Sequence, residues 1–95
     1  MDEKITEEWL NENSDFVEQN APYHYGFNLK QNSGHVRILY VHKDIDVTEV
    51  QCFLSKFLNP GEHDEKEQTF NLGSFKYIHE IVTLLKLIKR KKDDN

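Results

Sequence analysis

The segment Tyr23–His42, YHYGFNLKQNSGHVRILYVH, is the clearest indication of the fold because it is the one long stretch with a two-residue period. Its first half alternates apolar residues with polar or small ones, as a half-buried strand does. Residues 31–34 are typical turn residues, and residues 36–41 are again β-branched and aromatic. The segment therefore predicts an antiparallel β-hairpin over residues 23–42.

Two turn geometries fit this hairpin. A two-residue turn at residues 32–33 pairs Phe27 with Ile38 and places all the aromatic residues on one face. A three-residue loop with Gly34 in the left-handed conformation pairs Phe27 with Leu39 instead. Hydrophobic matching favours the first register and Gly34 favours the second, and we expect the first.

The aromatic residues of the hairpin have two interpretations. They are a stacking platform for unpaired bases, or they support the core. No arginine or lysine is interleaved on their face, which favours core packing. The residues concerned are Tyr23, Tyr25, Phe27 and Tyr40.

Helices are predicted on both sides of the hairpin. Thr6, followed by two glutamates, is typical of a helix N-cap, and we expect a helix over residues 3–19 with a weak point near Ser14. Residues 46–59 carry apolar side chains at helical spacing. This spacing predicts a second, amphipathic helix.

The C-terminal third predicts one strand and one helix. Residues 68–72 alternate as a short strand does, and Ser74 is expected to cap a last helix over residues 74–92. The predicted order is therefore α-β-β-α-β-α. It implies a two-layer α+β domain in which helices cover a β-hairpin and a short third strand.

Length and composition predict one small domain. The chain has 95 residues, of which 37% are hydrophobic, and its aromatic side chains supply large buried areas. No apolar run approaches the roughly 18 residues that a membrane span needs, and the acidic start is unlike a signal peptide. The single cysteine allows no internal disulfide and fits a reducing compartment. We therefore expect a cytoplasmic protein that does not contact a membrane.

The net charge of −5 is unevenly distributed. Residues 1–20 contain seven acidic residues and one basic residue, whereas residues 74–95 contain six basic residues and three acidic ones. This asymmetry favours self-association or an oriented partner, although it does not identify one.

Residues that could carry chemistry do not assemble into a known motif. His24 and His42 lie close together across the hairpin in either register, but no third and fourth ligand sits at metal-ligand spacing. Cys52 falls inside a predicted helix and not at a helix N-terminus, where its pKa would be lowered. The sequence contains no phosphate-binding glycine loop and no nucleophile elbow. We therefore predict a protein that is not an enzyme, with no metal and no cofactor.

Two runs together resemble the second part of a LAGLIDADG homing-endonuclease half, which has the order strand-helix-strand-helix. They are Ile38–Leu58 (ILYVHKDIDVTEVQCFLSKFL) and Phe70–Leu85 (FNLGSFKYIHEIVTLL), and the similarity lies in their apolar spacing. The first predicted helix departs from the family, because Trp9–Phe16 (WLNENSDF) lacks its glycines and its acidic metal ligand. The resemblance therefore carries over no catalytic residue.

The leading hypothesis is a non-catalytic protein-binding domain, such as an inhibitor, adaptor or assembly subunit. The last predicted helix is apolar over more than half its circumference, which leaves an apolar side for a partner or for a second copy in a homodimer. The acids of the first helix would steer that partner. The candidate docking residues are Tyr77, Leu84, Leu87, Glu8, Glu12 and Asp15.

The alternative hypothesis is a nucleic-acid-associated protein. The last predicted helix ends in a basic cluster that could contact phosphates. Its members are Lys86, Lys89, Arg90, Lys91 and Lys92. The negative net charge of the whole chain disfavours this hypothesis.

Overall fold

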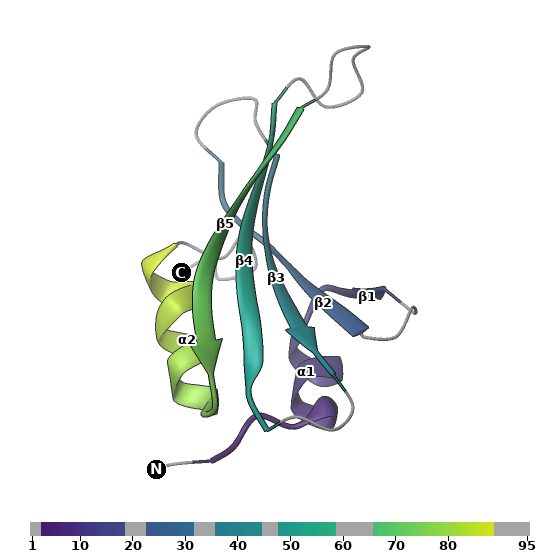
Figure 1. Ribbon diagram of the computed structural model, residues 1–95, viewed down its shortest axis with the longest axis vertical. Coiled ribbons are helices and arrows are strands. Elements are labelled where there is room, and N and C mark those ends of the chain that lie inside the picture. Colours follow the sequence, from purple (N-terminus) through teal and green to yellow (C-terminus); the bar gives the residue numbers. More distant parts are fainter. Residues whose placement is uncertain (1–2, 19–22, 32–35, 45–47, 59–65, 89–95) are drawn as a thin grey trace.

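An antiparallel sheet of five strands and two helices make up the computed structural model, which describes residues 3–18, 23–31, 36–44, 48–58 and 66–88 (Figure 1). The strands lie in the order β1-β2-β3-β4-β5. The fold is thus mixed α+β as predicted, but its element order differs from the prediction. The elements are α1 (Glu7–Asn13), β1 (Phe16–Glu18), β2 (Tyr23–Asn28), β3 (Val36–Lys43), β4 (Val50–Leu58), β5 (Lys66–Phe75) and α2 (Ile78–Leu87).

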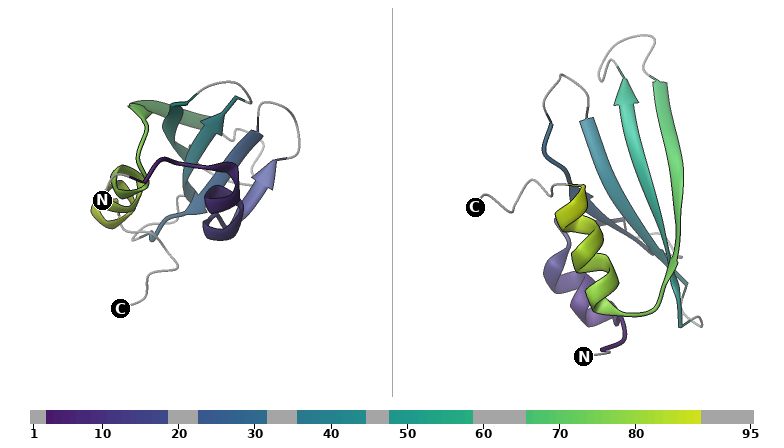
Figure 2. Two further views of the ribbon diagram at one scale, coloured as in Figure 1. Left: turned by 90° about the horizontal axis from the view of Figure 1, so that it is seen from below. Right: turned by 90° about the vertical axis from the view of Figure 1, so that its left-hand side faces the viewer.

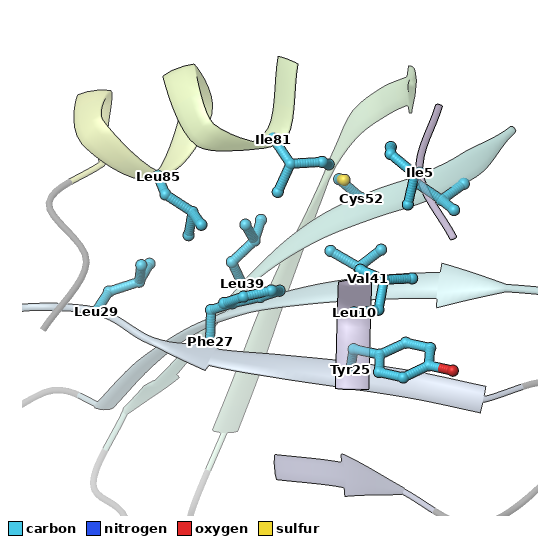
Figure 3. Packing of buried hydrophobic residues seen from close by; sticks show 11 residues of the cluster. Ile5, Leu10, Tyr25, Phe27, Leu29, Leu39, Val41, Cys52, Ile81 and Leu85 are labelled. Carbon is cyan, nitrogen blue, oxygen red and sulfur yellow. The ribbon is translucent and has the colours of Figure 1, made fainter. Parts of the chain in front are cut away.

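Both helices lie on the same face of the sheet (Figure 2). Leu10 from α1 and Ile81 and Leu85 from α2 are buried against side chains of the strands (Figure 3). Burial of this apolar surface is the main stabilising term of the fold. The core residues are Ile5, Leu10, Tyr25, Phe27, Leu29, Leu39, Val41, Val50, Cys52, Ile81 and Leu85.

The hairpin predicted over residues 23–42 is confirmed as β2 and β3, but in the other register. Phe27 faces Leu39, and the backbone N–H of Leu29 donates to the carbonyl of Arg37 at 3.1 Å. The expected pairing of Phe27 with Ile38 is therefore wrong. Residues 32–35, which connect the two strands, lie outside the described residues.

This register separates the aromatic residues of the hairpin. Tyr25 faces Val41 and is buried under the helices, whereas Tyr40 faces Gly26 on the opposite side of the sheet. The prediction that all of them pack on one face is therefore wrong for Tyr40, because a shift of one residue moves a side chain to the other face.

The helix predicted over residues 46–59 is wrong, because residues 50–58 form β4, which lies between β3 and β5 in the sheet. Val50 and Cys52 are buried on the helix-covered face, while Phe53 alternates to the other face. A central strand with apolar residues on both sides imitates the helical spacing, so periodicity alone does not separate the two. The helix implied by the resemblance to a LAGLIDADG half is absent for the same reason.

The helix predicted over residues 3–19 is too long. Thr6 is its N-cap, as expected, and its hydroxyl accepts a hydrogen bond from the Trp9 N–H at 3.1 Å. However, α1 ends at Asn13, and the chain then joins the sheet as β1. Asp15 stabilises this change of direction, because its carboxylate accepts from the Asn28 N–H at 2.7 Å and its own N–H donates to the Gly26 carbonyl at 2.8 Å.

The strand predicted over residues 68–72 extends to Lys66–Phe75, and the helix predicted over residues 74–92 begins later, at Ile78. Ser74 pairs with Gln51 inside β5 and does not cap the helix. A bulge at Leu72 is followed by Gly73, whose φ of 107° favours glycine.

The start of α2 is stabilised by Glu80. Its carboxylate accepts hydrogen bonds from the backbone N–H groups of Tyr77 and Lys76, both at 2.9 Å, and these bonds lower the pKa of Glu80. A carboxyl group with a lowered folded-state pKa stabilises the fold at neutral pH, and this contribution is lost as the pH falls through that pKa.

Candidate functional site

The face of the sheet opposite the helices carries the candidate site, and we call it the open face. The register places alternate residues of all five strands on it, in two neighbouring rows. One row is Glu18, His24, His42, Gln51 and Ser74. The other is Phe16, Gly26, Tyr40, Phe53 and Asn71. Ser55 and Thr69 follow one step further along the strands.

Aromatic rings form a continuous cluster across the open face. Tyr40 meets Phe16 edge-on, with ring centroids 6.2 Å apart, and meets His24 in the same manner at 6.3 Å. The His24 and His42 rings are 4.6 Å apart, and His42 is followed by Phe53 at 6.4 Å. Such contacts hold the rings in place.

Gly26 allows Phe16 to join this cluster. A Cβ atom at position 26 would overlap Cζ of Phe16, which shows that the ring lies directly over the glycine. The short strand β1 thereby closes one edge of the aromatic cluster. Glycine in a strand is used here for close approach of a neighbouring group.

A hollow of about 340 Å³ lies among these rings, and we call it the acidic hollow. Two glutamates, Glu18 and Glu67, contribute carboxylates from opposite edges of the sheet. Of the described residues, no lysine or arginine lines it. The residues that line it are Glu18, His24, Tyr40, Phe53, Ser55, Glu67 and Thr69.

The negative charge of the acidic hollow affects Tyr40. Burial raises the pKa of the Tyr40 hydroxyl, and the charges of Glu18 and Glu67 raise that pKa further. Both carboxylates therefore act on the aromatic floor of the hollow. The carboxylates favour a positive charge at this place, whereas burial, the main cause of the raised pKa, disfavours a charge of either sign.

A second hollow, of about 210 Å³, lies at the end of the open face beside His42. It is also acidic, with Asp44 and Glu49 among its lining residues. Nε2 of His42 lies 3.7 Å from the Asp44 carboxylate, and among the described groups this buried nitrogen has no hydrogen-bond partner.

The residues predicted for docking lie elsewhere, at α2. Leu87 is 72% exposed, whereas Leu84 is half-buried and packs against the core. Tyr77 is half-buried and stacks on His79, with ring centroids 5.8 Å apart. The structure therefore does not bring Tyr77, Leu84 and Leu87 together as a broad exposed apolar surface.

Of the three acidic residues predicted on the first helix, two lie on α1. Glu8 and Glu12 are exposed on α1, which lies on the other side of the sheet from the acidic hollow. Asp15 follows the helix and is half-buried in the contacts with β2 described above, so the prediction that it belongs to the first helix is wrong. Of the predicted basic cluster, Lys86 is exposed on α2, and residues 89–92 lie outside the described residues.

The histidine pair and Cys52, which were considered as possible chemical sites, also have defined positions in the fold. His24 and His42 are adjacent as predicted, yet the described side chains include no group of three or more His, Cys, Asp or Glu that could hold a metal. Cys52 is buried under the helices, and this burial raises the pKa of its thiol to about 12. A thiol of this kind stays protonated at neutral pH and is a poor nucleophile.

Comparison of the chain with models of protein families, with curated proteins and with solved structures found no match. Neither described helix is long and apolar enough to cross a membrane.

Sequence reasoning missed the open face because it treated residues 46–59 as a helix. Phe53 and Ser55 become neighbours of Tyr40 only when β4 lies between β3 and β5. One signal could have revealed this strand, namely the strand-forming residues Val50, Phe53 and Phe57 within the run Val50–Leu58.

Proposed function

We propose that this chain is a non-catalytic protein-binding domain of the cytoplasm, and that its partner covers the open face. The observation that carries the proposal is the acidic hollow with its ordered aromatic rim. Interfaces are enriched in aromatic side chains, and their energetic centres lie in pockets. The buried free thiol of Cys52 agrees with a reducing compartment.

The open face supports this function better than α2 does. Both helices cover one face of the sheet. Among the described residues, no element covers the aromatic rings on the other face. At α2, a single leucine, Leu87, is strongly exposed. The carboxylates in both hollows also disfavour a phosphate backbone on this face, so nucleic acid is the weaker alternative.

A capture experiment with two matched variants tests the proposal. Thr69→Arg places a long side chain at the acidic hollow, whereas Thr83→Arg makes the same change on the exposed surface of α2. Tagged wild type, both variants and Leu87→Ser are used to capture proteins from an extract of the source cells. We expect one protein that binds wild type, Thr83→Arg and Leu87→Ser but not Thr69→Arg.

Three outcomes of this experiment would contradict the proposal. Loss of capture with Leu87→Ser alone would place the partner on α2, and a captured protein unaffected by Thr69→Arg would place it away from the open face. The absence of any captured protein also contradicts the proposal. Circular dichroism and thermal unfolding establish that each variant is folded before capture is compared.

A further inference from the structure

We infer that the acidic hollow binds a cationic side chain, the guanidinium of an arginine or the ammonium of a lysine, from a basic segment of the partner protein. This inference rests on the proposed function and adds the chemistry of the group that is recognised. It is carried by the composition of the hollow and by the distribution of charge between the two faces of the sheet.

The composition of the hollow matches a cation in two ways. Tyr40 and Phe53 supply aromatic rings, which attract a cation placed over their faces. Glu18 and Glu67 supply carboxylates, which pair with a guanidinium or an ammonium. Together they offset the cost of removing a charged group from water, which an apolar pocket alone does not do.

The hollow is large enough to receive one long side chain. Its volume of about 340 Å³ is at the lower end of the range for pockets that enclose a whole small molecule. Ser55 and Thr69 add hydroxyl groups to the lining, and their oxygens lie 3.3 Å apart. A hydroxyl oxygen can accept a hydrogen bond from a guanidinium, which has five N–H donors to satisfy.

Charge is sorted between the faces of the sheet. Among strand residues whose side chains are described, the basic ones fall in the rows of the helix-covered face, as the register shows. They are Arg37, Lys43 and Lys56. The glutamates Glu18 and Glu67 fall in rows of the open face. This distribution favours a basic partner on the open face, and the net charge of −5 acts in the same direction.

Small probes test the inference without a known partner. The full-length chain, labelled with ¹⁵N, is titrated with N-acetyl-arginine amide and, separately, with N-acetyl-citrulline amide, which replaces the guanidinium by a neutral urea group. We expect the arginine probe to shift the amide signals of Glu18, Tyr40, Phe53 and Glu67. The citrulline probe should leave those signals almost unchanged.

Charge-matched variants locate the site. Glu18→Gln/Glu67→Gln neutralises the hollow, and Glu8→Gln/Glu12→Gln makes the same change on exposed residues of α1. We expect the first pair to weaken arginine binding by about tenfold, since two ion pairs are lost, and the second to leave it unchanged. Equal binding of both probes, equal binding by both variants, or no shift at the hollow would overturn the inference.

Failure of this inference can be told apart from failure of the proposed function. A captured protein that depends on position 69 but still binds Glu18→Gln/Glu67→Gln overturns the cationic ligand and keeps the protein-binding face. Specific arginine binding without any captured protein supports the site and overturns the proposed function. If wild type sediments as a dimer and Thr69→Arg as a monomer, a second copy of this chain occupies the open face. That result overturns the proposal of a separate partner protein.

Discussion

The two faces of the sheet differ in what their side chains do, although the same strands supply both. The face under the helices carries buried residues such as Phe27, Leu39 and Val41. The open face carries aromatic rings in partial contact with solvent and the carboxylates of Glu18 and Glu67. Alternate residues of one strand can therefore belong to a buried core and to a solvent-accessible surface, because successive side chains point to opposite faces.

The largest expected effect compares two phenylalanines on opposite faces. Phe27 is fully buried, so Phe27→Ala should lower the free energy of unfolding by about 3–5 kcal/mol. Phe53 is only half-buried, and Phe53→Ala should cost roughly 1–2 kcal/mol. Urea unfolding of both variants measures the difference, and equal losses would remove the distinction between a structural face and an open one. If Phe27→Ala does not fold, Phe27→Leu gives a smaller loss in the same direction.

A smaller effect should appear at alkaline pH, and it belongs to the helix-covered face. The pKa of Cys52 is raised from 9.0 to about 12, so above pH 9 the unfolded chain loses the thiol proton while the folded chain keeps it. Stability should therefore fall as the pH rises from 9, by about 2 kcal/mol at pH 10.5.

Urea midpoints between pH 8 and 10.5 measure this loss, with Cys52→Val as the control that should lack the thiol contribution. Identical pH dependence in both proteins would contradict the assignment to Cys52. Tyr25 and Tyr40, whose pKa values are raised mainly by burial, would destabilise both proteins above pH 10 in the same direction.

The smallest expected effect on stability concerns Gly26 on the open face. Gly26→Ala pushes the Phe16 ring away from the strand, because the new methyl group would overlap it. The free energy of unfolding should fall by about 1 kcal/mol, since the ring can move outward. We expect the NMR signals of the Tyr40 ring, which contacts Phe16 in the wild type, to shift in Gly26→Ala. Unchanged signals would show that Phe16 does not organise the open face.

The sequence predictions were right where a local pattern allowed one interpretation and wrong where it allowed two. Thr6 as an N-cap, the hairpin of β2 and β3, and the helical stripe of α2 all depend on residues within a few positions of one another. The register of the hairpin was wrong because two turns were compatible with the sequence. The element at residues 50–58 was wrong because its apolar residues fit both a helix and a strand that is covered on both sides.

An α+β fold with a hairpin, an acidic first helix and no recognisable catalytic motif could be read from the amino-acid sequence. The place of β4 between β3 and β5, and the shared face of Tyr40, Phe53, Glu18 and Glu67, came only with folding. Strand pairing joins residues far apart in the chain, and a shift of one residue exchanges the two faces of a strand. The acidic hollow therefore exists only in the folded sheet.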